Sequence, residues 1–349
     1  MSHPGPLKVA VIGLGQMGIS HSLAYHDNPG FEIVALVNRG PIKKLPDHLK
    51  IYTTLTNLSD ALQLSPDVVS INTHPASHAE YAIAAMEAGA HVFVEKPLAT
   101  TIAEAEYVIE TARRTNRKVV VGFILRHHPS WAEFIRQARQ LGPPFVMRMN
   151  LNQRSTGEAW EIHKKLLQDA KSPVIDCGVH YLDVMLQISD SKPTQVRGMG
   201  VALGDEIPQN QVNYGHLQVI FADGSVGWYE AGWGPMMSET AYFVKDVIGS
   251  RGSVSIVMGE SSSTAASSHT RTSKLRVGTV VDGSPRDETL SLKDEPDHNE
   301  LCAREQQFLL DAIVGDYDLS QHMEDAVRSL SIVLAADASM RDHRAIDLA

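Results

Sequence analysis

The sequence predicts an α/β protein with two domains: a doubly wound parallel sheet, followed by an α+β domain with a large, mostly antiparallel open sheet. Three observations predict this fold class. Short apolar runs alternate with helical segments over the first third of the chain, longer alternating strands follow the Pro143-Pro144 pair, and two amphipathic helices close the chain. We therefore expect a first domain over residues 1–125 and a second over residues 126–349.

The strands expected in the first domain are nearly continuous in apolar residues, which is typical of parallel strands that helices cover on both faces. They are Lys8–Ile12, Glu32–Val37, Asp67–Ile71, His91–Val94 and Lys118–Val121. Capping boxes, in which a Ser or Thr and a Glu three residues later satisfy each other's backbone N–H groups, mark helix starts between them. They are Ser77 with Glu80, Thr101 with Glu104 and Ser130 with Glu133. Gly89 is placed to end a helix in the left-handed conformation.

The second domain is expected to contain longer strands of mixed or alternating polarity. They are Phe145–Asn152, Val196–Leu203, Gly215–Phe221, Gly224–Ala231, Thr240–Ile248 and Ser253–Met258. Ala222-Asp223-Gly224 is a hairpin turn signal. Helices are expected over Val174–Ile188, Asn299–Val314 and Met323–Met340. The Ser- and Thr-rich segment Glu260–Lys274 predicts a solvated loop.

Composition excludes several classes of function. Lys and Arg number 31 against 41 Asp and Glu, so the net charge of −10 argues against a nucleic-acid partner. No apolar stretch approaches the ~20 residues that cross a membrane, and Met1–Pro6 lacks the layout of a secretory signal. Two cysteines, Cys177 and Cys302, are too few for a disulfide scaffold or a four-thiolate zinc site. We expect a cytoplasmic protein.

The first strand is followed by Gly13-Leu14-Gly15-Gln16-Met17-Gly18, which opens a helix. Gly13 permits a tight turn, Gly15 lets the backbone approach a pyrophosphate, and Gly18 lets helix and strand pack closely. The anion would then lie on free N–H groups, including those of Gln16 and Met17, at the positive end of the helix. At the first strand-to-helix junction this pattern predicts a Rossmann dinucleotide-binding domain.

The end of the second strand distinguishes between the two nicotinamide cofactors. NAD-binding proteins usually place an Asp or Glu there to accept the ribose hydroxyls, whereas this chain has Asn38-Arg39. The next loop adds Lys43, Lys44 and Lys50. A guanidinium can pair with a 2′-phosphate, so the cations favour NADP(H) over NAD(H). The alternative is a solvated basic loop with NAD held through Asn38.

Further motifs follow the other strands. They are Asn72-Thr73-His74-Pro75 with His78, Glu95-Lys96-Pro97, Val121-Gly122-Phe123 with Arg126, and Asp176-x-Gly178-x-His180-x-x-Asp183. Together with the glycine turn, they resemble the Gfo/Idh/MocA family of oxidoreductases over most of the chain. The resemblance implies oxidation or reduction of one hydroxyl of a sugar, inositol or related polyol with NAD(H) or NADP(H). It also implies a homodimer or homotetramer whose open sheet faces a partner subunit.

Three residues are the candidates for catalysis. Lys96 follows a parallel strand at its carboxyl end, where doubly wound sheets bind ligands. Asp176 and His180 are four residues apart, so they project from one helix face. A histidine can take the hydroxyl proton at neutral pH, an ammonium stabilises the alkoxide, and a carboxylate orients either the imidazole or the substrate. The competing interpretations are a surface lysine at a strand end and an ion pair on a helix.

The resemblance also implies contacts to the cofactor from Thr73, His74, His78, Glu95 and Lys96. Substrate contacts are expected from Arg126, His127, Trp160 and His163, although a packed or exposed role fits these residues too. The chain departs from the common family pattern at Trp160-Glu161, at His127-His128 and at Ala170-Lys171-Ser172-Pro173. These departures affect the expected identity of the substrate more than the expected type of reaction.

No metal is expected, because Asp176, His180 and Asp183 do not follow a known metal-ligand spacing. Two other functions remain as alternatives. One is redox-assisted glycoside hydrolysis with tightly bound NAD, and the other is a non-catalytic NAD(P)-binding regulator. The sequence leaves the identity of the sugar, the hydroxyl that reacts and the direction of the reaction open.

Overall fold

The computed structural model describes residues 5–42, 44–169, 172–238, 244–257, 272–281, 283–292 and 295–348. The chain forms two compact units. The first contains the residues up to His127 together with Pro296–Val327, and the second contains His128–Glu295 and Arg328–Ala349. The first boundary lies close to the division expected after residue 125, but the sequence prediction assigned residues 296–327 to the second domain.

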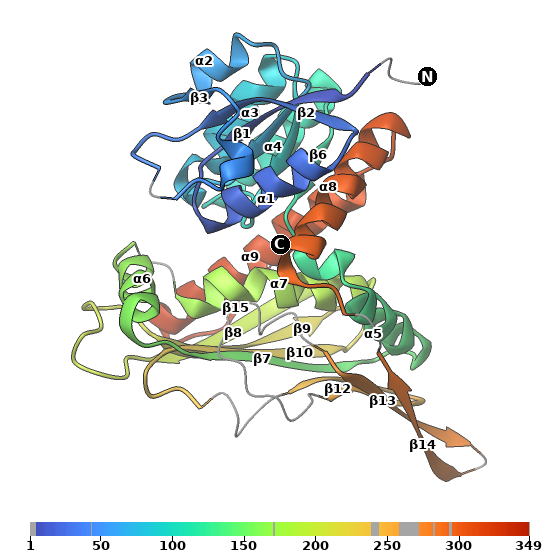
Figure 1. The fold of residues 1–349 in the computed structure, drawn as a ribbon. Helices are drawn as coiled ribbons and strands as arrows, with labels where there is room; N and C mark the ends of the chain where they lie inside the picture. The colour runs from blue at the N-terminus through green and yellow to red at the C-terminus, as the bar shows by residue number, and fades with distance from the viewer. Residues whose placement is uncertain are drawn as a thin grey trace. The chain divides into compact units, whose positions relative to one another are not determined.

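The sheet of the first unit is parallel throughout, with the strand order β3-β2-β1-β4-β5-β6 (Figure 1). Its strands are β1 (Leu7–Ile12), β2 (Phe31–Val37), β3 (Thr54–Leu55), β4 (Val68–Ile71), β5 (His91–Val94) and β6 (Val119–Val121). The five predicted strands are confirmed. The sequence analysis missed β3, because two residues are too short to show a pattern.

The helices of the first unit are α1 (Gln16–Asp27), α2 (Leu58–Leu62), α3 (His78–Glu87), α4 (Ile102–Thr115) and α8 (His298–Val314), with 3₁₀ turns η1 (Asp47–Leu49), η2 (Pro75–Ser77) and η3 (Ile124–His127). The α8 helix packs against α1 and against the sheet core, since Leu309 and Ala312 belong to the same buried cluster as Leu7, Val9 and Val11. Burial of this apolar face explains why α8 belongs to the first unit.

One of the three predicted capping boxes forms. The Thr101 side chain accepts from the Glu104 N–H, and the Glu104 side chain accepts from the Thr101 N–H. Ser77 makes no capping hydrogen bond to α3, because its hydroxyl donates to the His74 carbonyl at 2.9 Å. The third expected cap, Ser130, is replaced by His128, whose ring accepts from the Ser130 N–H. A nearby backbone carbonyl thus engages the Ser77 hydroxyl, whereas the His128 side chain, two residues before Ser130, takes over the cap of α5.

The second unit is built on a nine-stranded sheet with the order β14-β13-β12-β11-β7-β10-β9-β8-β15. Its strands are β7 (Val146–Arg154), β8 (Pro193–Val201), β9 (Tyr214–Phe221), β10 (Val226–Gly234), β11 (Lys245–Gly249), β12 (Gly252–Val257), β13 (Lys274–Val281), β14 (Ser284–Ser291) and β15 (Ile346–Asp347). All neighbours are antiparallel except β7 and β10. The six predicted strands correspond to β7–β12, and the fold class is confirmed.

The sequence analysis missed the β13–β14 hairpin and β15. The β14 strand contains a proline and three charged residues, and it lies exposed at the edge of the sheet, where polar side chains discourage further strand pairing. The beginning of the expected strand Thr240–Ile248 and most of the expected loop Glu260–Lys274 lie outside the described residues.

Helices cover one face of this sheet (Figure 1). They are α5 (Pro129–Gln140), α6 (Gly157–Gln168), α7 (Pro173–Ile188) and most of α9 (Ser320–Asp342). The α7 helix is buried along nearly its whole length and packs on β10, where a Cβ at Gly178 would lie 3.3 Å from the Tyr229 ring. The sequence analysis did not predict α6. Within the described part of the chain, no helix has the length and apolarity needed to span a bilayer.

Candidate active site

The residues that follow the parallel strands share one edge of the first sheet. Backbone hydrogen bonds of 2.8–2.9 Å fix this edge: Gly13 donates to Val37, Asn72 to Ile12, Glu95 to Ile71 and Gly122 to Val94. The carboxyl ends of the strands therefore bring together motifs that lie more than a hundred residues apart in sequence, as expected for a doubly wound sheet.

The glycine turn between β1 and α1 has the geometry that the sequence predicted. Gly13 has a φ of +88°, and a Cβ at Gly18 would lie 1.7 Å from the Gly13 carbonyl oxygen. Gly15, by contrast, has no atom within 4 Å of its ideal Cβ position and precedes α1 without a capping side chain. Exposed Gln16 and half-buried Met17 form the first turn of α1, which contains no acidic residue. The open space and the uncapped helix N-terminus fit a diphosphate.

Asn38 follows β2 and holds the glycine turn in place. Its amide oxygen accepts from the Leu14 N–H at 3.0 Å, and its amide nitrogen donates to the Gly40 carbonyl at 2.8 Å. Both ends of this side chain are thus engaged in loop structure. Asn38 consequently offers less to a ribose than the sequence suggested.

The basic loop after β2 contains fewer available cations than the sequence suggested. The Lys50 ammonium lies 2.6 Å from Asp47, and this hydrogen bond lowers the pKa of the Asp47 carboxyl. Lys43 lies outside the described residues. Arg39 and Lys44 are exposed, and neither forms an ion pair with another described side chain. Among the described residues of this loop, the positive charge therefore rests mainly on Arg39 and Lys44.

The loop after β4 is linked to the loop after β5 through His78. The buried His78 ring places Nδ1 2.7 Å from the Pro97 carbonyl oxygen and Nε2 3.0 Å from the Thr73 carbonyl oxygen. The Thr73 hydroxyl lies 2.7 Å from that of Ser77, and the His74 ring accepts from the Ala76 N–H at 3.4 Å. His78 thus joins the segments on either side of the candidate cofactor site and fixes the position of Pro97.

Glu95 and Lys96 follow β5. The buried Glu95 carboxylate lies 2.8 Å from the His21 ring and accepts from the Lys96 N–H at 3.2 Å. Burial raises the pKa of this carboxyl, but the hydrogen bond with His21 and the positive charge of Lys96 lower the pKa overall. The Glu95 side chain is therefore ionised inside the protein, next to the half-buried Lys96.

Arg126 and His127, two of the expected substrate residues, have partners within the first unit. The Arg126 guanidinium lies 2.9 Å from Asp325 and 5.5 Å from the centre of the Phe123 ring. The His127 ring packs against Phe308 at 5.1 Å. Burial, with the charge of Arg126, lowers the pKa of His127 to about 4, so this ring is neutral at physiological pH.

The second unit supplies Asp176 and His180 from α7. Ser172 caps this helix by accepting from the Ile175 N–H, and Pro173 occupies its first turn. Asp176 is half-buried and His180 is buried one turn later on the same face. Lys96 belongs to the first unit and this pair to the second, so their joint action remains a proposal.

His163 lies on a polar patch beside Asp176. Its ring stacks on Trp233 at 4.3 Å with an interplanar angle of 14°, and Nδ1 lies 3.0 Å from the Ser155 hydroxyl. Burial lowers the pKa of His163 to about 4, against the opposing effect of the Asp176 charge. The Trp233 indole donates to Gln153 at 2.8 Å. Trp233 and Gln153 had no local sequence signal, because β7 and β10 meet only in the folded sheet.

Trp160 has a different environment. Its side chain is buried, its indole N–H donates to Glu206 at 2.8 Å, and the Lys164 ammonium lies 5.8 Å from the ring centre. These contacts attach α6 to the loop after β8. They favour the packing role over the substrate contact.

A profile described as an oxidoreductase family with an NAD-binding Rossmann fold matches residues 7–123, and the Gfo/Idh/MocA C-terminal domain matches residues 132–255. The chain is 26% identical over 263 residues to scyllo-inositol 2-dehydrogenase (NAD(+)) of Bacillus subtilis, covering 72% of this chain and 73% of that protein.

Two further proteins are similar. D-glucoside 3-dehydrogenase of Escherichia coli is 28% identical over 194 residues, which cover 52% of this chain and only 54% of that protein, about half its length. An oxidoreductase from Agrobacterium radiobacter, solved with NAD+, L-tartaric acid and magnesium, has the same fold, with a TM-score of 0.76 at 17% identity over 98% of both chains. With both of its domains matched, the chain belongs to the Gfo/Idh/MocA family of oxidoreductases.

Proposed function

We propose that the protein transfers a hydride between a nicotinamide cofactor and the hydroxyl or keto carbon of a sugar, inositol or related polyol. One observation supports this most strongly: a single chain combines the glycine turn and Lys96 with the Asp176 and His180 face of α7. The named activities of the inositol and glucoside dehydrogenase relatives agree with this substrate class.

Each residue has a role in this reaction. The N–H groups at the start of α1 bind the diphosphate, and the nicotinamide, when bound, accepts or supplies the hydride. His180 takes the hydroxyl proton during oxidation and returns it during reduction. The Lys96 ammonium stabilises the alkoxide and Asp176 orients the imidazole or the substrate.

The second unit provides a surface suited to a polyol. The half-buried His163 ring, which stacks on the buried Trp233 indole, lies beside the charge of Asp176, and half-buried Gln153 adds an amide. Sugars bind through ring stacking combined with hydrogen bonds to their hydroxyl groups. His163 is therefore our proposed substrate contact from this patch.

A panel of sugars and cyclitols, with NADPH or NADP⁺ and then NADH or NAD⁺, tests the proposal through nicotinamide absorbance. We expect turnover with at least one polyol or its ketone. Release of an aglycone without net cofactor consumption would instead indicate glycoside hydrolysis. Cofactor binding without turnover of any of these compounds would indicate a regulator.

We further propose that NADP(H) is preferred, because Arg39 is exposed and lies where the ribose 2′-phosphate would bind. Replacing Arg39 by alanine should weaken NADPH binding about tenfold or more, since hydrogen bonds between charged groups contribute about 1.5–3 kcal/mol. NADH affinity should change far less. Fluorescence titration measures both affinities.

Lys50→Ala is the matched control, because Lys50 is already paired with Asp47 and should leave the ratio of affinities unchanged. Equal losses of NADPH and NADH affinity in Arg39→Ala, or a wild type that prefers NADH, would refute the assignment.

We also propose that the protein is a homodimer or homotetramer that uses the open face of the second sheet. Ile248, Val146, Val226 and Ile220 are all 39–43% exposed. The strand register aligns them in one row across β11, β7, β10 and β9. Four exposed branched side chains in one row are typical of a covered surface rather than of scattered exposed residues.

Light scattering should give at least a dimer for the wild type. Substituting the paired residues Ile220 and Val226 by aspartate should produce monomers, because charges would be buried without partners. Val314→Asp, at a valine of α8 that is 47% exposed, should leave the assembly intact. A monomeric wild type contradicts the proposal.

A further inference from the structure

A chain of buried hydrogen bonds runs beneath Lys96 inside the first unit. His21 of α1 is completely buried, and its Nε2 lies 2.8 Å from Glu95. Its other ring nitrogen, Nδ1, accepts from the Gln306 amide of α8 at 2.9 Å, and Gln306 in turn accepts from the Tyr25 hydroxyl. Residues 285 positions apart in sequence thus converge on one carboxylate.

The chemistry of the donors and acceptors determines which group donates in each of these hydrogen bonds. The Gln306 NH₂ group can only donate, so His21 Nδ1 must accept and the ring hydrogen is on Nε2. Nε2 then donates to one oxygen of Glu95, while the other oxygen accepts from the Lys96 N–H. This series of hydrogen bonds ends on an ionised carboxylate, which holds the Lys96 peptide and is stabilised by the positive charge of Lys96.

A second carboxyl lies in the same region in a different state. Glu305 of α8 is buried, and neither of its oxygens has a hydrogen-bond partner among the described residues. Burial, reinforced by the negative charge of Glu95, raises the pKa of Glu305 well above the ordinary value, so Glu305 holds a proton. His21 and Lys96 therefore stabilise a negative charge on Glu95 but not one on Glu305.

Three other titratable groups border these carboxyls. His78 faces Glu95 from α3, and its charge also favours the ionised form of Glu95. On α8, burial raises the pKa of the Cys302 thiol and lowers the pKa of His298. The Cys302 thiol and the unprotonated His298 ring are uncharged, so neither changes the pKa of Glu95 through its charge.

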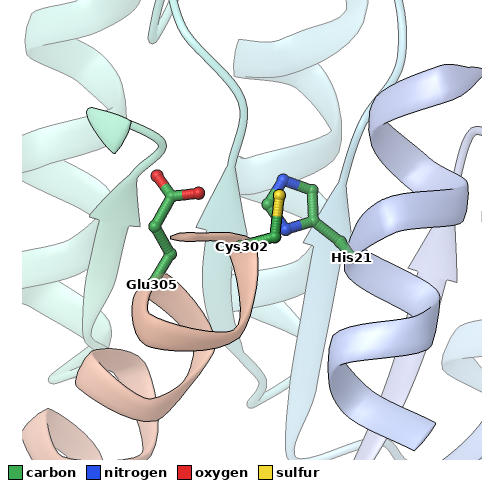
Figure 2. Close-up of side chains that lie close together, drawn as sticks. All are labelled: His21, Cys302 and Glu305. Atoms are coloured by element: carbon green, nitrogen blue, oxygen red, sulfur yellow. The ribbon is translucent and has the colours of Figure 1, made fainter. Parts of the chain in front are cut away.

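His21, Cys302 and Glu305 place possible metal-ligand atoms within 4.8 Å of one another (Figure 2). Both ring nitrogens of His21 already form hydrogen bonds of 2.8 and 2.9 Å, so an ion would have to displace either Glu95 or Gln306. The hydrogen-bonded arrangement satisfies His21 fully without an ion. It is therefore favoured over a metal site, which becomes an outcome of the test.

We infer that His21, oriented by Gln306, is a positioning residue for Lys96. It keeps Glu95 ionised and in place, and Glu95 fixes the Lys96 peptide and attracts its ammonium. This inference rests on the proposed role of Lys96 in hydride transfer. It assigns a function to α8, which the sequence analysis placed in the other domain.

The test compares His21→Leu with His21→Gln. Leucine removes the donor to Glu95, so the carboxyl should take up a proton more easily. We expect kcat to fall at least about tenfold, as for the loss of one charge-assisted hydrogen bond, with the acid limb of its pH profile moved to higher pH. Glutamine can donate from the position of Nε2, so it should restore most of kcat and the wild-type limb.

A purely structural role would lower stability in both variants without moving the acid limb, and that result would overturn the inference. NAD(P)H affinity should stay within about threefold of wild type, because the diphosphate turn is unchanged. If His21→Leu does not fold, His21→Asn replaces it, since its shorter amide does not reach Glu95.

An infrared measurement tests the carboxyls without using activity. Wild-type protein at neutral pH should show a protonated buried carboxyl that Glu305→Gln removes, and His21→Leu should add a second one from Glu95. If the wild type shows no turnover of any polyol, the proposed function fails and the infrared bands still decide the state of Glu95. If the wild type is active and His21→Leu matches it, only the inference fails.

Two further measurements complete the test. Since Glu305 binds its proton more tightly in the folded state, its stabilising contribution is present at low pH and is lost as the pH rises. Glu305→Gln should therefore raise Tm by an amount that grows between about pH 5 and pH 8. Stoichiometric metal in the purified protein that Cys302→Ser abolishes and Cys177→Ser retains would replace the inference with a metal site.

Discussion

Replacing Lys96 or His180 by alanine should lower kcat about 10²–10⁴-fold, the range for loss of a proton-transfer group or of alkoxide stabilisation. Neither substitution touches the glycine turn, so NAD(P)H should bind within about threefold of the wild-type affinity. Steady-state kinetics with the best polyol and a fluorescence titration measure the two quantities. A large loss of kcat with unchanged cofactor binding would assign both residues to the chemical step.

The double variant distinguishes the roles further. If Lys96 and His180 act on the same reacting oxygen, the double variant should be little worse than the poorer single variant, because effects within one catalytic unit are not additive. Lys8→Ala, at an exposed lysine of β1, controls for loss of a positive charge. Full activity in both single variants would refute the catalytic assignment.

Two alanine substitutions in the glycine turn should both impair cofactor binding but should differ in their effect on stability. A Cβ at Gly18 would lie 1.7 Å from the Gly13 carbonyl oxygen, so the backbone must shift. We expect Gly18→Ala to lower the free energy of unfolding by about 3 kcal/mol, the upper range for overpacking, and to abolish cofactor binding. Gly15→Ala meets no atom within 4 Å at a φ of −74°, so stability should change by less than about 1 kcal/mol.

The added methyl group of Gly15→Ala should nevertheless weaken NAD(P)H binding about tenfold or more, because it occupies the approach of the diphosphate. Urea unfolding and cofactor titration separate the two effects. Wild-type affinity in Gly15→Ala would mean that the turn does not bind the diphosphate. Equal destabilisation by both substitutions would contradict the packing that distinguishes the two glycines.

Local patterns were sufficient for most of the first sheet. The strands β1, β2, β4, β5 and β6 are apolar throughout because helices cover both faces, and this composition is visible without the fold. The β13–β14 hairpin could not be found in this way, because its outer strand is polar and depends on its neighbour for hydrogen bonds. The α6 helix was missed because its segment contains more polar side chains than buried ones.

Some features of the candidate site could likewise be predicted from local spacing, whereas others depend on the fold. The spacing of Gly13, Gly15 and Gly18 and that of Asp176 and His180 lie within one element each, so sequence alone could relate them. From sequence, the charged residues after β2 could be counted, but their ion pairs could not be predicted. The fold shows that Lys50 is neutralised by Asp47, and it leaves Arg39 exposed as the cation on which our NADP proposal depends.

The sequence by itself determined the fold class, the glycine turn and the family, because short-range spacing and strand composition encode them. Only the tertiary structure decided that α8 returns to the first unit and that His21 and Gln306 meet Glu95 beneath Lys96. These contacts join residues 74 and 285 positions apart. Burial of the apolar face of α8 against α1 brings them together, and no local pattern records which surface a helix will cover.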